Sequence, residues 1–177
     1  MRSLALVLIG LPLAVLMAVV RPAWASEARA AVDMANRLLS ADPPRRDEAR
    51  ALFDQVARSA SDDGDAAAEA RLRLGEIDED EGAFAQALGH YRASFAAAPA
   101  SPWALHATER IDWLRSRSEG DFVPLARLER VRRDSVIASD ASAIDALARE
   151  ADGFPPGIVR VEARMLVAEA WLGRMRR

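Results

Sequence analysis

Residues 68–101 read AEARLRLGEIDEDEGAFAQALGHYRASFAAAPAS, and this stretch decides how the chain is expected to fold. Its first part places Leu72, Leu74 and Ile77 at helical spacing, and Gly82 ends that helix. A second apolar stripe at the same spacing follows and is closed by Pro99; it consists of Phe84, Ala87, Leu88, Tyr91 and Phe95. The stretch therefore predicts a hairpin of two amphipathic helices.

Apolar stripes of the same kind recur on both sides of this hairpin. They predict further helices over residues 27–41, 45–60, 102–116, 122–137, 139–151 and 158–175. Proline and glycine interrupt the stripes between them, and no segment alternates with period two for long enough to be a strand. We therefore expect an all-α protein of about eight helices, in antiparallel hairpins stacked as a short α-solenoid.

The composition excludes several classes of chemistry. The chain of 177 residues contains no cysteine, which excludes disulfides, thiolate catalysis and cysteine metal ligands. Its net charge is -3, and no run of basic residues suggests the basic face that a nucleic-acid-binding protein usually carries. We therefore expect no nucleic-acid partner.

The N-terminus resembles an export signal. Arg2 precedes an uncharged apolar run over residues 4–20, and Ala23 and Ala25 fit a small-residue cleavage site. This pattern predicts a signal peptide over residues 1–25, a mature chain that starts at Ser26, and a periplasmic location if the host is Gram-negative. The alternative is an uncleaved anchor in the inner membrane, because residues 4–20 are just long enough to cross a bilayer.

The hairpin at 68–101 resembles the tetratricopeptide repeat, whose pattern is W-x2-L-G-x2-Y, then A-x3-F, then P. The matching residues are Leu74, Gly75, Ala87, Tyr91 and Pro99, with Gly82 and Phe84 at the turn. Arg71 and Asp78 depart from the family, which usually has large aromatic residues there. The resemblance implies a tetratricopeptide-like domain over residues 26–177, with its best repeat at 68–101 and partial repeats at 27–61, 102–138 and 139–177.

The last helix has an unusual position in that scheme. Residues 162–170 parallel residues 69–77, so the helix looks like the first helix of a repeat whose second helix is missing. It is either a terminal cap, which solenoids need, or the end of a truncated chain, or a docking face for a partner or a second copy. The residues proposed for such a docking face are Leu166, Trp171 and Met175.

In tetratricopeptide arrays the first helices of successive repeats line a groove, and the resemblance implies such a groove here. From the best repeat it contains Glu69, Leu72, Glu76, Glu79 and Asp80. From the following helix it contains Trp103, His106, Arg110 and Trp113, which lie on one helical stripe. We hypothesise that this surface binds a peptide, because tryptophan and arginine are enriched at binding hot spots. The alternative is that both tryptophans pack against neighbouring helices and Arg110 pairs with Glu76.

The remaining candidates for chemistry are weak. His106 and Glu109 alone are too few for a zinc site, and no nucleophile or phosphate-binding motif occurs. The acidic run at residues 76–81 is interpreted as a solvated helix face, and residues 62–65 as helix-capping residues rather than a calcium loop. We expect no cofactor, no metal and no catalysis.

The function expected from these observations is an exported, non-catalytic protein-binding scaffold of the bacterial cell envelope. One alternative is an accessory helical subunit of a peptidoglycan-processing system of the lytic transglycosylase type. Another is a subunit that self-assembles through its C-terminal helix.

Overall fold

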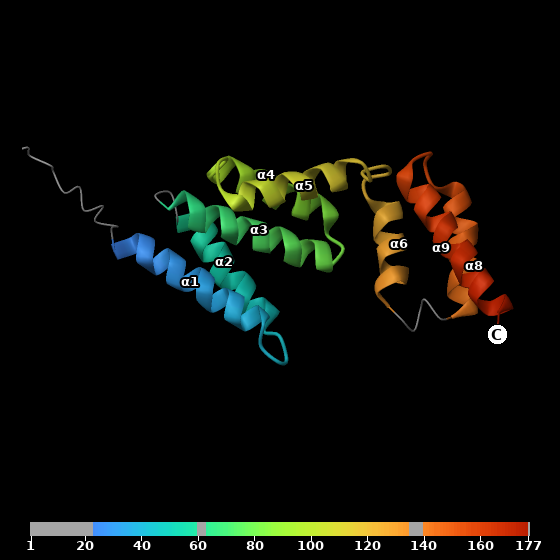
Figure 1. The fold of residues 1–177 in the computed structure, drawn as a ribbon, viewed down its shortest axis with the longest axis horizontal. Helices are drawn as coiled ribbons and strands as arrows, with labels where there is room; N and C mark the ends of the chain where they lie inside the picture. Colours follow the sequence, from blue (N-terminus) through green and yellow to red (C-terminus); the bar gives the residue numbers. More distant parts are fainter. Residues whose placement is uncertain (1–22, 60–62, 135–139, 177) are drawn as a thin grey trace, which may run out of the picture.

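The computed structural model describes residues 23–59, 63–134 and 140–176, and over these ranges the protein consists of helices and their connections (Figure 1). The described ranges contain eight helices, as predicted: α1 Ala23–Leu39, α2 Arg46–Ser59, α3 Gly64–Asp80, α4 Phe84–Ala97, α5 Pro102–Arg115, α6 Val123–Arg133, α8 Ala141–Gly153 and α9 Ile158–Met175. The all-α fold with packed helix pairs in a solenoid-like arrangement is confirmed.

Helices α1 to α5 follow the expected order of packing. Each helix packs against the next one along the chain, and α3 with α4 is the most extensive pair. Helix α3 also contacts both α1 and α5, so the first helices of successive hairpins are neighbours. This is the relationship that stacked helical hairpins require.

The α3–α4 hairpin closes tightly because it has a glycine at its crossing. A Cβ atom added to Gly75 would lie 2.6 Å from Cε1 of Tyr91, which is fully buried. Beside this contact, the Ser94 hydroxyl donates a hydrogen bond of 2.7 Å to the carbonyl oxygen of Ala68. The absence of a side chain at Gly75 therefore allows the two helices to approach closely.

Local signals at the helix ends explain where these elements begin. Asp63 caps α3 by accepting a hydrogen bond of 3.0 Å from the backbone N–H of Ala66, in agreement with the capping interpretation. Ser101 caps α5 in the same way, and Pro102 occupies its first turn. Gly82 has a φ of +80°, which glycine adopts without steric cost, and it connects α3 to α4.

The two departures from the repeat pattern are filled by polar contacts. The Arg71 guanidinium donates to the carbonyl oxygen of Ala57 at 2.9 Å, which ties α3 to α2. The carboxylate of Asp78 is buried and accepts a hydrogen bond of 2.6 Å from Arg50 on α2. At both positions a hydrogen bond that involves an arginine, from α3 to α2, therefore takes the place of the aromatic packing that is usual in the family.

The connection from α5 to α6 breaks the simple hairpin series. Gly120, Asp121 and Phe122 all have positive φ angles of 60°, 52° and 66°, a conformation that costs non-glycine residues roughly 1 kcal/mol each. Phe122 is held there by burial and by an aromatic contact with Phe84, with ring centroids 6.2 Å apart. Phe122 occupies the N-cap position of α6, and this helix has no side-chain cap.

Beyond this turn the chain forms a second group of helices. Helix α6 packs against α8 and α9, which also pack against each other, and Figure 1 shows these three helices side by side. The expected hairpin of residues 102–116 with residues 122–137 is therefore replaced by packing of α6 on the two C-terminal helices. The physical reason is the left-handed turn, which directs α6 away from α5 (Figure 1).

Helix α3 lies between two clusters of buried apolar residues. Leu74 and Ile77 belong to a cluster shared with α1 and α2. Leu72 belongs to a larger cluster that extends through α4, α5 and α6 to Val167 on α9. The same helix therefore supports both halves of the described chain, which explains why its sequence is the most informative stretch.

The predicted signal peptide lies mostly outside the described residues, which begin at Ala23, so the alternative anchor at residues 4–20 lies outside them too. Among the helices that are described, none combines the length and apolar character that a membrane span requires.

Candidate functional site

Two predicted groove residues lie inside the protein. Leu72 is fully buried in the larger apolar cluster. Glu69 is only 3% exposed, and its carboxylate accepts hydrogen bonds from Arg29 at 2.6 Å and from the side-chain amide of Asn36 at 3.0 Å. Both were expected to face a partner. Both expectations are corrected: α1 packs over Glu69, and the larger apolar cluster surrounds Leu72.

The acidic run at the end of α3 is exposed at its last two residues, as expected of a solvated face, but its middle forms an ionic hub. Asp78 is 4% exposed and lies between Arg50, at 2.6 Å, and His90, whose Nε2 atom is 3.4 Å from its carboxylate. Arg50 also binds Glu81 at 2.7 Å. Burial lowers the pKa of Arg50, but the hydrogen bonds to these two carboxylates outweigh it and leave that pKa above its ordinary value.

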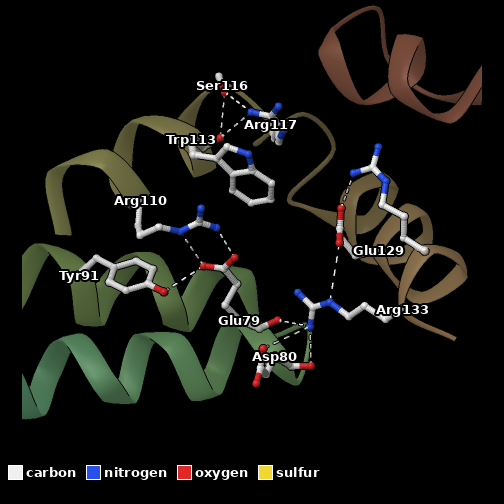
Figure 2. A network of polar contacts seen from close by, with 10 residues as sticks. Glu79, Asp80, Tyr91, Arg110, Trp113, Ser116, Arg117, Glu129 and Arg133 are labelled. Carbon is white, nitrogen blue, oxygen red and sulfur yellow. Dashed lines mark hydrogen bonds and ion pairs between the residues drawn. The ribbon is translucent and has the colours of Figure 1, made fainter. Parts of the chain in front are cut away.

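Glu79 is the centre of a second set of contacts on this hub (Figure 2). Its carboxylate accepts a hydrogen bond of 2.9 Å from the Tyr91 hydroxyl and forms an ion pair with Arg110 on α5. Burial, together with the negative charge of Glu79, raises the pKa of Tyr91 above its ordinary value of 10.0. Arg110 was expected to pair with Glu76 if it had a structural role; it pairs with Glu79, and Glu76 binds Arg73 at 2.7 Å.

Arginine side chains cover the two tryptophans of the α5 stripe. The Cζ atoms of Arg110 and Arg117 each lie 4.5 Å from the ring centroid of Trp113. The Cζ atom of Arg73 lies 5.8 Å from the ring centroid of Trp103. These distances are typical of cation–π contacts. Both tryptophans are half-buried and pack against the larger apolar cluster.

The α5 stripe is continuous with the C-terminal helices through Arg117. Its guanidinium binds Glu162 on α9 at 2.6 Å, and the two side chains are 15% and 21% exposed. A second connection is made by Arg133 on α6, which donates to the carbonyl oxygens of Glu79 at 2.9 Å and Asp80 at 2.6 Å (Figure 2). A cation at the carboxyl end of a helix is favourable, because unpaired carbonyl groups are exposed there.

An open cleft of about 850 Å³ lies where α6 meets the end of α3. It is lined mainly by charged residues: Asp80, Glu81, Gly82, Ala126, Arg127, Glu129, Arg130, Arg133 and Asp134. Of the predicted groove residues only Asp80 reaches it. The sequence pattern missed the α6 side of this cleft, because its residues were assigned to a hairpin with α5 and not to a wall opposite α3.

The predicted docking face at the C-terminus is partly exposed. Trp171 and Met175 are 46% and 75% exposed, whereas Leu166 is half-buried against the larger apolar cluster. The Trp171 indole donates a hydrogen bond of 3.2 Å to Asp145 on α8, which fixes the ring against the neighbouring helix.

Metal ligands do not gather in the described part of the chain. Over residues 23–59, 63–134 and 140–176, no group of three or more histidine or acidic side chains is arranged to hold a metal ion. His106 is exposed on the α5 stripe, and His90 belongs to the Asp78 contacts.

Comparisons with known proteins return no family model, no curated protein and no solved structure that matches this chain. The tetratricopeptide assignment therefore stays a prediction, carried by the residues of the 68–101 hairpin.

Proposed function

We propose that this chain is a non-catalytic scaffold that binds a peptide segment of another protein across α3 and α5. The observation that supports it best is the α5 stripe, where the half-buried Trp103 and Trp113 flank the exposed His106 and lie beside arginine planes. Half-buried tryptophan and arginine are the side chains that most often dominate binding energy at protein interfaces.

The charges on this surface indicate how a peptide is selected. Arg73 is paired with Glu76, Arg110 with Glu79, and Arg117 with Glu162. Because each of these cations already has a carboxylate partner, little net charge remains to attract a charged peptide. We therefore expect recognition by apolar and aromatic side chains that pack against the half-buried indoles and the guanidinium groups beside them, with weak dependence on salt.

The proposed location is the bacterial cell envelope. It is supported by the apolar run at residues 4–20 and the small residues at 23 and 25. Cleavage before Ser26 would remove only the start of α1, and the buried α1 residues Val32 and Ala35 lie well downstream. Mass spectrometry of the protein purified from its host should give a chain that starts at Ser26; an intact residue 4–20 segment would favour the anchored alternative.

The binding proposal can be tested with peptides selected from a random display library against the purified protein. The selected peptides should bind the variant His106→Glu, which changes an exposed side chain, at least tenfold more weakly than the unmodified protein. The double variant Trp103→Ala and Trp113→Ala should not bind them. Leu105→Glu is the matched control, because Leu105 directly precedes His106 on α5 and its side chain is 68% exposed.

Far-UV circular dichroism decides what a loss of binding means. The His106 variant should keep the helicity and melting temperature of the unmodified protein, since that side chain is exposed. If no peptide is selected, or if selected peptides bind the His106 and Leu105 variants equally, the α5 stripe is not the binding surface.

A further inference from the structure

Helix α9 is apolar on two opposite faces, and only one of them is covered. Val159, Ala163 and Val167 are buried against the neighbouring helices. On the other face a row of apolar residues is exposed: Ile158, Val161, Met165, Ala168, Leu172 and Met175. At about 100° per residue the centres of the two faces lie roughly 180° apart. A helix that is apolar on every side is normally covered on every side.

The spacing of the exposed row identifies the kind of surface that fits it. From Ile158 to Met175 the steps are 3, 4, 3, 4 and 3 residues along α9. This alternation is the a/d pattern of a coiled coil, in which each apolar side chain inserts between four residues of a facing helix. Scattered single apolar residues on a surface have no such period. The complementary surface is therefore another helix with the same repeat.

The charges beside the row indicate that this other helix is α9 of a second copy. Glu162 and Glu169 border the row on one side, and Arg164 and Trp171 border it on the other. In a parallel pair the two sides meet, which places Arg164 of each copy opposite Glu169 of the other. In an antiparallel pair like sides meet, and the glutamates would repel one another. The sequence thus favours a parallel pair.

We propose that the protein forms a parallel homodimer through the exposed a/d row of α9. This goes beyond peptide binding by α5 and does not depend on it, because the two surfaces share no residue. Stable specific interfaces bury about 1,200–2,000 Å² in total, and a seam of six residues on each copy lies at or below the lower end of that range. We therefore expect a reversible dimer with a dissociation constant on the order of 10 µM.

Analytical ultracentrifugation of the full chain over a concentration series tests the dimer directly. The unmodified protein should shift from monomer to dimer between about 1 and 100 µM. The variant Met165→Glu with Leu172→Glu should stay monomeric throughout, because it places charges in the seam. Leu105→Glu, on α5, is the matched control and should dimerise normally. A monomer at every concentration would overturn the proposal, even if a different protein were found to bind α9.

Charge exchange tests the orientation. Arg164→Glu and Glu169→Arg should each weaken dimerisation about tenfold, since each places like charges opposite one another. A one-to-one mixture of the two variants should recover the original affinity, because the mixed pair has two attractive contacts. Recovery also shows that loss of the exposed contact between Arg164 and Asp152 is not the cause. No recovery in the mixture would contradict a parallel pair.

The absence of cysteine from the sequence permits a covalent test of the same geometry. Met175→Cys should form a disulfide-linked dimer under mild oxidation, because identical positions face each other in a parallel seam. Leu105→Cys, the control, should not cross-link at the same concentration. Equal cross-linking of the two variants would mean random collision and would contradict the proposed seam.

Discussion

Tyr91 makes the alkaline stability of this protein a direct measure of its α3–α4 packing. The chain has one tyrosine, no cysteine and no lysine, so Tyr91 is the only side chain whose ordinary pKa lies between about 9 and 12. It is fully buried and donates to Glu79 at 2.9 Å. Burial and the Glu79 charge raise its pKa above 10.0, the value that applies to the unfolded chain.

The sign and size of the effect follow from proton linkage. Below pH 10 both states keep the phenol proton, and stability does not depend on it. Above pH 10 the unfolded chain releases the proton while the folded chain retains it, so the free energy of unfolding falls by about 1.4 kcal/mol per pH unit. In Tyr91→Phe this loss should be absent, and its stability should stay nearly constant from pH 10 to pH 11.5.

Urea unfolding followed by circular dichroism at each pH measures the slope. Absorbance at 295 nm, measured alongside, reports ionisation of this one phenol. The tyrosinate signal should appear only as the helices unfold. If it appears near pH 10 while the helicity remains native, the hydroxyl is accessible and its contact with Glu79 is not formed, which would refute the reasoning.

Three further substitutions test the packing and the hub. Glu79→Ala should lower the free energy of unfolding by about 2 kcal/mol, because it leaves the buried Tyr91 hydroxyl without an acceptor. Glu109→Ala, on the exposed side of α5, should change that free energy by less than about 0.5 kcal/mol. A similar loss of stability in both variants would contradict the ionic hub. Gly75→Ala should cost about 1–3 kcal/mol from the clash described above, whereas Gly89→Ala, which meets open space in α4, should stabilise the protein by up to about 1 kcal/mol; urea midpoints distinguish the two. Asp140 caps α8, and hydrogen bonds from the backbone amide and the hydroxyl of Ser142 lower the pKa of the Asp140 carboxyl below 3.8. The stabilisation that the ionised Asp140 provides is therefore present above pH 3.8 and is lost as the pH falls through the folded pKa. Asp140→Asn should match the unmodified protein at neutral pH and lose stability less steeply in acid.

The hairpin could be predicted from the sequence because its signals are local. Gly82 was expected to end the first helix and residues 62–65 to cap it, and in the structure Gly82 connects α3 to α4 and Asp63 caps α3. The buried position of Leu72 also follows from its apolar stripe. The groove assignment placed it at the surface because that assignment came from family positions and not from the stripe itself.

The parts that could not be predicted depend on distant contacts. Nothing near Glu79 in the sequence indicates that Tyr91 and Arg110 converge on it from two other helices. The orientation of α6 depends on the left-handed conformation of Asp121 and Phe122, and non-glycine residues rarely signal that conformation. The Arg133 contact with the end of α3 follows from that orientation and was missed for the same reason.

The proposal that α5 carries the binding surface is tested most directly by hydrogen–deuterium exchange of the protein with and without a selected peptide. Residues 102–115 and the adjoining part of α3 from Arg73 to Asp80 should become protected on binding, and the His106→Glu variant should lose that protection. Protection confined to other elements, such as α2 or α9, with no change over α5 would contradict the account.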